Sequence, residues 1–142
     1  MGKRLIDRTE IKVRFNEVDS MAIVWHGNYV QYLEEGRESF GKHYGISYLD
    51  IYANQVMAPV VNLEINFKKQ VKYGETIIVE TEYIDQQAAK LVFYYRIYRK
   101  SNNDLVATAS STQVFIDMNH EMLLYPPDFA VEWKKKMGLL EA

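Results

Sequence analysis

The apolar residues of the chain recur with two different periods, one helical and one extended. In the first third of the chain they stand three and four positions apart, at Tyr29, Val30, Leu33, Gly36 and Phe40. Polar residues occupy the other faces of this segment, which is the pattern of an amphipathic helix. We expect the helix to run from about Asn28 to His43, with Asn28 as its N-cap. A glycine in the apolar stripe costs roughly 1 kcal/mol relative to alanine, which indicates close packing at Gly36.

Beyond residue 60 the period changes to two, which is typical of a strand with one solvent-facing side. The alternation is clearest at Val61, Leu63, Ile65 and Phe67, which are separated by polar residues. Turn-forming residues separate the segments that follow. We expect a short opening strand and four later ones, at Ile11–Phe15, Val61–Phe67, Thr76–Asp85, Lys90–Arg99 and Leu105–Asp117.

The order strand, helix, then four strands with short connections indicates an α+β fold with an antiparallel sheet. One long helix covers only one face of such a sheet, so part of the apolar surface is expected to be buried by self-association. Pro126 and Pro127 introduce a final short helix, expected at Asp128–Met137 and ended by Gly138. At 142 residues, the chain suits a single domain over residues 1–142.

The composition excludes several classes of protein. The chain is 48% hydrophobic and 25% charged, and its formal net charge of -2 gives no general attraction to nucleic acid or anionic membranes. It has no cysteine, which rules out thiolate nucleophiles and disulfides. The first ten residues are too charged for a secretory signal, and no apolar run is long enough to span a bilayer. We therefore expect a cytoplasmic protein that neither binds nucleic acid nor inserts into membranes.

The strongest candidate for chemistry stands just before the predicted helix, where Asp19 and His26 are found. A helix start offers backbone N–H groups without intrahelical partners, and its dipole favours developing negative charge. A carboxylate beside such donors suggests hydrolysis. Asp19 also suits a simple turn, because aspartate and serine are common where a chain enters a helix. The histidines, including His43 and His120, are too dispersed for metal ligation, so we expect no metal.

The segment DSMAIVWHGNY at Asp19–Tyr29, continued by YLEEGR at Tyr32–Arg37, resembles the hotdog-fold acyl-CoA thioesterases of the 4-hydroxybenzoyl-CoA thioesterase family. The resemblance covers nearly the whole chain, with weaker matches at Val71–Thr76 and Ala107–Ala109. It implies a five-stranded antiparallel sheet wrapped around a central helix. It also implies dimers or homotetramers whose sheets join edge to edge, with active sites at the interface. Ala22 departs from the glycine of many relatives, and glycine alone adopts a positive φ freely.

The resemblance further implies hydrolysis of an acyl-CoA thioester to a carboxylic acid and free coenzyme A, with no separate cofactor. Asp19 matches the catalytic aspartate, either as general base toward water or as a nucleophile that forms an anhydride. The oxyanion donor would be the backbone N–H of His26 or Gly27, and one such donor is worth on the order of 100-fold to 1000-fold in rate. The His26 side chain would orient water or bind the thioester, while Asn28 and Tyr29 would shape the pocket.

Alternatives remain open at this point. Glu34 stands on the central helix, where another hotdog lineage carries its catalytic carboxylate. The substrate could be an acyl carrier protein thioester, and hotdog hydratases or a protein that binds acyl thioesters without turnover are further possibilities. A basic group at a strand end could contact the phosphates of coenzyme A or simply protect a sheet edge. Its members are Lys68, Lys69 and Lys72.

Overall fold

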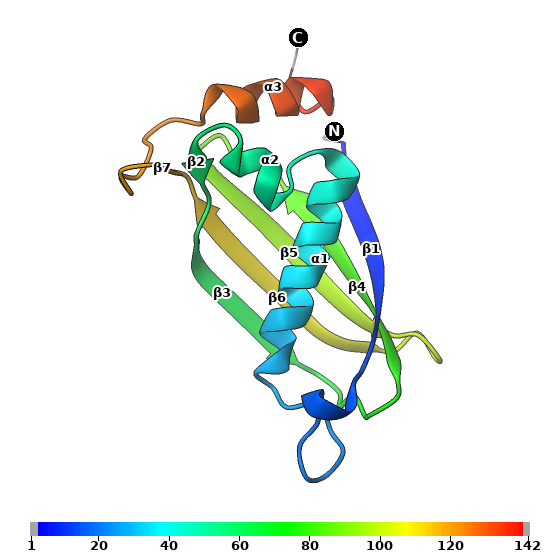
Figure 1. Cartoon of the computed structure of the whole chain (residues 1–142). Helices are drawn as coiled ribbons and strands as arrows, with labels where there is room; N and C mark the ends of the chain where they lie inside the picture. The colour runs from blue at the N-terminus through cyan, green and yellow to red at the C-terminus, as the bar shows by residue number, and fades with distance from the viewer. Residues whose placement is uncertain (1–2, 141–142) are drawn as a thin grey trace.

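Five strands form one antiparallel sheet in the order β1-β4-β5-β6-β3. In the computed structural model, which describes residues 3–140, these strands are β1 (Leu5–Lys12), β3 (Val60–Phe67), β4 (Thr76–Ile84), β5 (Lys90–Arg99) and β6 (Leu105–Val114). The long helix α1 (Asn28–Tyr44) lies along one face of this sheet (Figure 1). The predicted α+β fold, a five-stranded antiparallel sheet around a central helix, is therefore confirmed.

The smaller elements gather at the two ends of α1. A short 3-10 helix, η1 (Phe15–Glu17), precedes the loop that leads into α1. At the far end lie α2 (Tyr48–Tyr52), α3 (Asp128–Lys136) and a two-stranded sheet of β2 (Val56–Met57) and β7 (Ile116–Asp117) (Figure 1). The expected C-terminal helix is confirmed, and α1 ends one residue after its expected end.

Two of the predicted strands are wrong in their bounds. The opening strand covers Leu5–Lys12 instead of Ile11–Phe15. Its alternation was hidden because one of its buried positions is the polar Asp7, whose carboxylate lies 2.9 Å from His43 Nδ1. The last predicted strand is interrupted at the buried Phe115, and the short β7 continues it.

The core lies between α1 and the inner face of the sheet. Strand β5 directs alternate residues inward, at Leu91, Phe93, Tyr95 and Ile97. On α1 the buried face includes Tyr32, whereas Val30, expected to be buried, is 38% exposed. A Cβ atom on Gly36 would lie 2.6 Å from the side chain of Val79 and 2.8 Å from that of Thr81. The close packing predicted at Gly36 is therefore confirmed, and it is against side chains of β4.

Strand β3 is an edge of the sheet and pairs with β6 alone among the described strands. Its apolar residues are poorly covered in the single chain, with Val61 59% and Phe67 52% exposed. Within residues 3–140, no helix combines the length and apolar character needed to cross a membrane.

Candidate active site

Asp19 opens a tight turn in the loop between η1 and α1. Its Oδ1 accepts hydrogen bonds from the N–H of Met21 at 2.8 Å and of Ile23 at 3.4 Å, while its own N–H donates to the Ile23 carbonyl at 2.8 Å. Ala22 has a φ of 61°, so alanine adopts here the conformation that glycine favours. The carboxylate is exposed in the single chain. Asp19 therefore has a local role in the turn, and its second oxygen is available for other contacts.

The loop that carries Asp19 is fastened to the segment after β3. Val24 N–H donates to the Val71 carbonyl at 2.8 Å, and Tyr73 N–H donates to the Ala22 carbonyl at 3.0 Å. Ile23 and Lys72 form an antiparallel bridge between these bonds. Lys72 is thus a backbone neighbour of the Asp19 turn, and the loop has a defined place on the sheet.

Glu17 joins this loop to the first turn of α1. Its carbonyl accepts the N–H of Trp25 at 3.0 Å and the side-chain amide of Asn28 at 2.7 Å. Its carboxylate accepts the Tyr32 hydroxyl at 3.0 Å and the N–H of Arg14 at 2.8 Å. The N-cap prediction for Asn28 is wrong, because Gly27 occupies that position and the Asn28 side chain turns back to Glu17.

Nothing in the sequence indicated a role for Glu17 or for Tyr32, although Tyr32 begins the YLEEGR segment. The available signal was that Tyr32 follows Asn28 by four positions, which places both side chains on one helix face. Burial of the phenol, followed by its contact with the Glu17 carboxylate, raises the pKa of Tyr32. Tyr32 is therefore a protonated donor throughout the neutral range.

The entry to α1 leaves two backbone donors free of backbone partners. Asn28 N–H donates to the Trp25 carbonyl at 2.9 Å, and Tyr29 N–H donates to the His26 carbonyl at 3.2 Å. Across the described residues, the N–H groups of His26 and Gly27 donate to no backbone carbonyl. These are the two groups that the sequence indicated as oxyanion donors, and the helix dipole favours negative charge beside them.

An open hollow of about 330 Å³ lies beside these donors. Its wall contains five residues singled out in the sequence: Asp19, His26, Tyr29, Lys68 and Lys69. Tyr29 packs edge to face against Phe67 with ring centroids 4.9 Å apart, and burial raises the pKa of Tyr29. His26 lies against the ring of Trp25, with a centroid separation of 5.1 Å.

Three other candidates lie outside the wall of this hollow. Asn28 is directed to Glu17, and Gly27 is not a wall residue, because the ring of Trp25 packs over its Cα atom. Lys72 lies near the loop, but it is not a wall residue. Within the wall, Lys69 is paired with Asp104 at 3.1 Å. Of the predicted basic group, Lys68 and Lys69 line the hollow and Lys72 does not.

A second cavity, of about 470 Å³ and mostly apolar, lies between the later part of α1, α2 and the beginning of β3. Its wall includes Met57, Val60, Phe93 and the buried Gln113, whose amide donates to the Ala58 carbonyl at 2.5 Å. Glu34 lines this cavity instead of the Asp19 hollow. The two spaces share none of their wall residues within the described chain.

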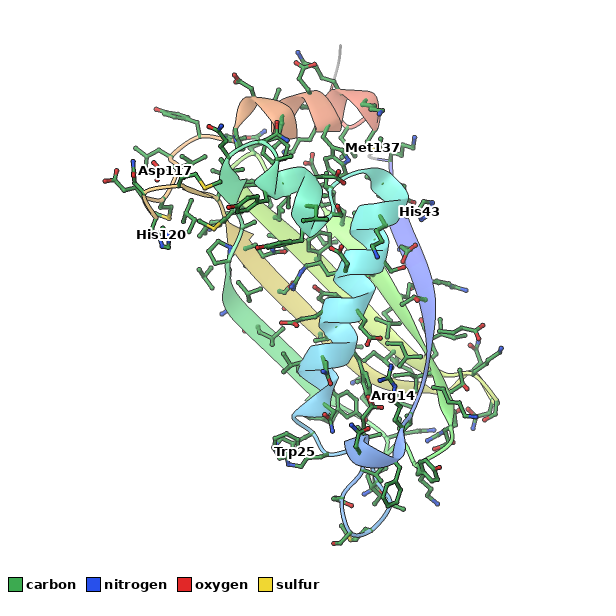
Figure 2. The ribbon with its side chains drawn as sticks, in the orientation of Figure 1. Arg14, Trp25, His43, Asp117, His120 and Met137 are labelled. Atoms are coloured by element: carbon green, nitrogen blue, oxygen red, sulfur yellow. The ribbon has the colours of Figure 1, made fainter. Side chains whose placement is uncertain are left out.

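The remaining histidines lie away from the hollow. Figure 2 shows Trp25 near the start of α1, while His43 and His120 lie toward the opposite end of the molecule. His43 pairs with Asp7, and His120 belongs to a loop after β7. Over residues 3–140, no three His, Asp, Glu or Cys side chains come together in a way that could hold a metal ion.

The long helix α1 lies on one face of a five-stranded antiparallel sheet, and Asp19 and two N–H groups without backbone partners stand where that helix begins, which indicates a hotdog-fold thioesterase. Residues 13–133 match the family described as the thioesterase-like superfamily. The chain belongs to this superfamily, and the resemblance predicted from the sequence is confirmed.

Individual relatives agree with this membership. The chain is 38% identical over 112 residues to the Bacillus subtilis protein named "Putative acyl-CoA thioesterase YneP", covering 79% of this chain and 80% of the relative. The structure of a DHNA-CoA thioesterase from Staphylococcus aureus is similar, with a TM-score of 0.82, 28% identity and coverage of 94% and 92%. A 4-hydroxybenzoyl-CoA thioesterase variant in complex with 4-hydroxybenzoyl-CoA shares the fold at a TM-score of 0.78 and 18% identity, with coverage of 91% and 98%.

Proposed function

We propose that the protein hydrolyses acyl-CoA thioesters to a carboxylic acid and free coenzyme A. The observation that carries this proposal is that Asp19 and His26 line one hollow at the start of α1, where the N–H groups of His26 and Gly27 donate to no backbone carbonyl among the described residues. Family membership and the names of the relatives support the same reaction. We propose no cofactor, because coenzyme A is part of the substrate and hydrolysis needs only water.

In the first route Asp19 acts as general base. Its carboxylate takes a proton from water as the water oxygen attacks the thioester carbonyl carbon. The carbonyl oxygen becomes negative, and the N–H groups of His26 and Gly27 stabilise it. The C–S bond then breaks, and the proton passes to the sulfur of the departing coenzyme A. The His26 side chain, in the wall of the hollow, orients the water or the thioester.

In the second route the Asp19 carboxylate attacks the carbonyl carbon itself, the C–S bond breaks, and coenzyme A leaves as the thiolate, which takes a proton from water. Water then hydrolyses the mixed anhydride and restores the carboxylate. The two routes differ in one observable, because only the second adds the acyl mass to the protein. Mass spectrometry of a rapidly quenched reaction therefore separates them.

The phosphates of coenzyme A are proposed to contact the basic group near the hollow. Lys68 and Lys69 stand in its wall, and Lys72 is bridged to the loop that carries Asp19. Lysine acts on phosphate as a flexible point charge, so these contacts need no fixed geometry. Tyr29 and Trp25 would line the path between the phosphates and the thioester.

We also propose that the active form is a homo-oligomer joined through the free edge of β3. Antiparallel pairing of this strand with its copy would cover Val60, Val61 and Phe67, which are 41%, 59% and 52% exposed. About a two-fold axis near the middle of β3, the Val60 end of one chain would meet the Phe67 end of the other. The apolar cavity of one subunit would then adjoin the Asp19 hollow of its partner and receive the acyl group.

The test is release of free thiol from short, medium, long and aromatic acyl-CoAs by the wild-type protein and by Asp19→Asn. Turnover that depends on Asp19 supports the proposal, and the preferred acyl group defines the substrate class. Turnover that survives the substitution moves the base elsewhere, with Glu34 tested next. Turnover only with acyl carrier protein thioesters, or binding without any product, would replace the proposal with one of those two alternatives.

A further inference from the structure

Glu17 binds the residues on either side of His26 and Gly27, the two residues with free N–H groups at the start of α1. The Glu17 carbonyl accepts the N–H of Trp25, which comes before His26, and the side-chain amide of Asn28, which comes after Gly27. The donor N–H of His26 shares a rigid peptide plane with the Trp25 carbonyl, and that carbonyl accepts the N–H of Asn28. A displacement of Glu17 would therefore turn the peptide planes that carry the donors.

The side chain of Glu17 is itself fixed from α1. Tyr32 is 1% exposed, and its hydroxyl donates to Glu17 Oε1 at 3.0 Å. The same oxygen accepts the N–H of Arg14 at 2.8 Å. Tyr32 follows Asn28 by one helical turn, so one face of α1 forms hydrogen bonds with both the backbone and the side chain of Glu17. Glu17 and Tyr32 are absent from the wall of the Asp19 hollow, so we assign them no contact with substrate.

We infer that Glu17 and Tyr32 form a positioning clamp that holds the backbone donors of His26 and Gly27 in the orientation needed for the oxyanion. This inference rests on the proposed thioester hydrolysis. It concerns residues that act through others, because the hydroxyl of Tyr32 orients Glu17 and Glu17 orients the loop. A well-placed donor is useful only within a small range of positions, and a misplacement of about 1 Å can cost on the order of 100-fold in rate.

The experiment compares Tyr32→Phe with Tyr44→Phe. Both substitutions remove one hydroxyl from a tyrosine of α1, and the Tyr44 hydroxyl donates to the Ile6 carbonyl at 2.9 Å, far from the hollow. For Tyr32→Phe we expect kcat to fall about tenfold with little change in KM, because the donors act on the transition state. Tyr44→Phe should keep the wild-type kcat. Equal kcat losses in the two variants, or none in Tyr32→Phe, would overturn the clamp.

Glu17 supplies a rescue test. Glu17→Gln keeps a side-chain oxygen that can accept from Tyr32 and Arg14, whereas Glu17→Ala keeps none. We expect Glu17→Gln to retain most of kcat and Glu17→Ala to lose at least as much as Tyr32→Phe. A loss in Glu17→Gln as large as that in Glu17→Ala would contradict a role based on the hydrogen bond.

Hydrogen exchange separates the clamp from the proposed reaction. Peptides covering residues 18–29 should exchange faster in Tyr32→Phe than in Tyr44→Phe, with the other peptides unchanged, whether or not a substrate has been found. Unchanged exchange in this segment would overturn the clamp. If exchange is faster in Tyr32→Phe but the wild-type protein hydrolyses no thioester, the proposed function is overturned and the clamp remains as a structural device only.

Discussion

The loop Asp19–Ile23 and the loop Asp117–Glu121 form the same type of turn, with the same pattern of hydrogen bonds. In each, the aspartate Oδ1 accepts the N–H groups two and four positions later, at 2.8 and 3.4 Å in the first loop and 2.8 and 3.1 Å in the second. In each, the N–H of the aspartate donates to the carbonyl four positions on. The fourth residue has a positive φ in both, 61° at Ala22 and 64° at His120.

The two turns differ in what surrounds them. The Asp117 turn begins at the last residue of β7, at the opposite end of the molecule from Trp25 (Figure 2). The Asp19 turn stands at the entry to α1, beside the free N–H groups of His26 and Gly27 and beside Lys68. The turn explains why an aspartate is present at both places, and it gives no reason for chemistry at either. The comparison teaches that the case for Asp19 as a catalytic residue depends on its neighbours.

The largest difference is expected in turnover. Asparagine retains an Oδ1 for the turn and removes the base or nucleophile, so Asp19→Asn should lower kcat by about 100-fold or more, the range of a general base. Asp117→Asn is the matched control and should keep the wild-type kcat. Thiol release measures both variants, and urea unfolding should show that both remain folded. Similar kcat values for the two variants would remove the functional distinction between the turns.

The next largest effect concerns stability, and it should be the same in both turns. Alanine removes the oxygen that accepts two backbone N–H groups, so Asp19→Ala and Asp117→Ala should each lower the free energy of unfolding by about 1 kcal/mol. Urea unfolding at a constant slope measures this difference. A much larger loss at Asp19 would show that its loop is important for stability as well, and would weaken the comparison.

Long periodic segments made most of the fold predictable. The alternation of Leu91, Phe93, Tyr95 and Ile97 and the spacing of Leu33 and Phe40 reflect burial on one face, which is a repeated physical constraint. Strand β1 was misplaced because Asp7 is buried with a histidine partner, and one polar residue breaks a short pattern. The helix α2 has five residues, too few for a period, and it depends on the local cap formed by Ser47 and Asp50.

The candidate site was predictable where its residues are adjacent in sequence. Asp19, His26 and Tyr29 come together because one loop carries them, and the motif preceding the helix indicated this. Lys68 lies near Asp19 and His26 because β3 ends beside the start of α1. This is a tertiary contact, and the spacing of nearby residues in the sequence does not predict it. A role for Tyr32 was not predicted for a different reason: it was not counted in the apolar stripe, and a buried tyrosine on a helix is usually explained by core packing.

Removal of the positive charge of Lys68, beside the Asp19 turn, should have a smaller effect, on KM. Lys68→Gln should raise KM for acyl-CoA about twofold to threefold with little change in kcat, because one exposed charge contact contributes about 0.5 kcal/mol. The increase should disappear at high salt. Lys136→Gln, an equal charge change on α3 at the other end of the molecule, is the control. Equal increases in both variants would indicate a response to net charge instead of a contact at the hollow.

The smallest effect tests whether the two turns are strained to the same degree. A non-glycine residue in the left-handed region destabilises the folded state by roughly 1 to 2 kcal/mol. Glycine removes this strain, but its unfolded chain has more conformational entropy, which cancels part of the gain. Ala22→Gly and His120→Gly should therefore each raise the free energy of unfolding by about 0.5 kcal/mol, measured by urea unfolding. Ala22→Gly should leave kcat unchanged, because the hydrogen bonds of the turn are retained. Stabilisation by His120→Gly together with a loss of kcat in Ala22→Gly would mean that the Asp19 turn uses its strain to hold the carboxylate, which would be a functional difference between two turns of similar geometry.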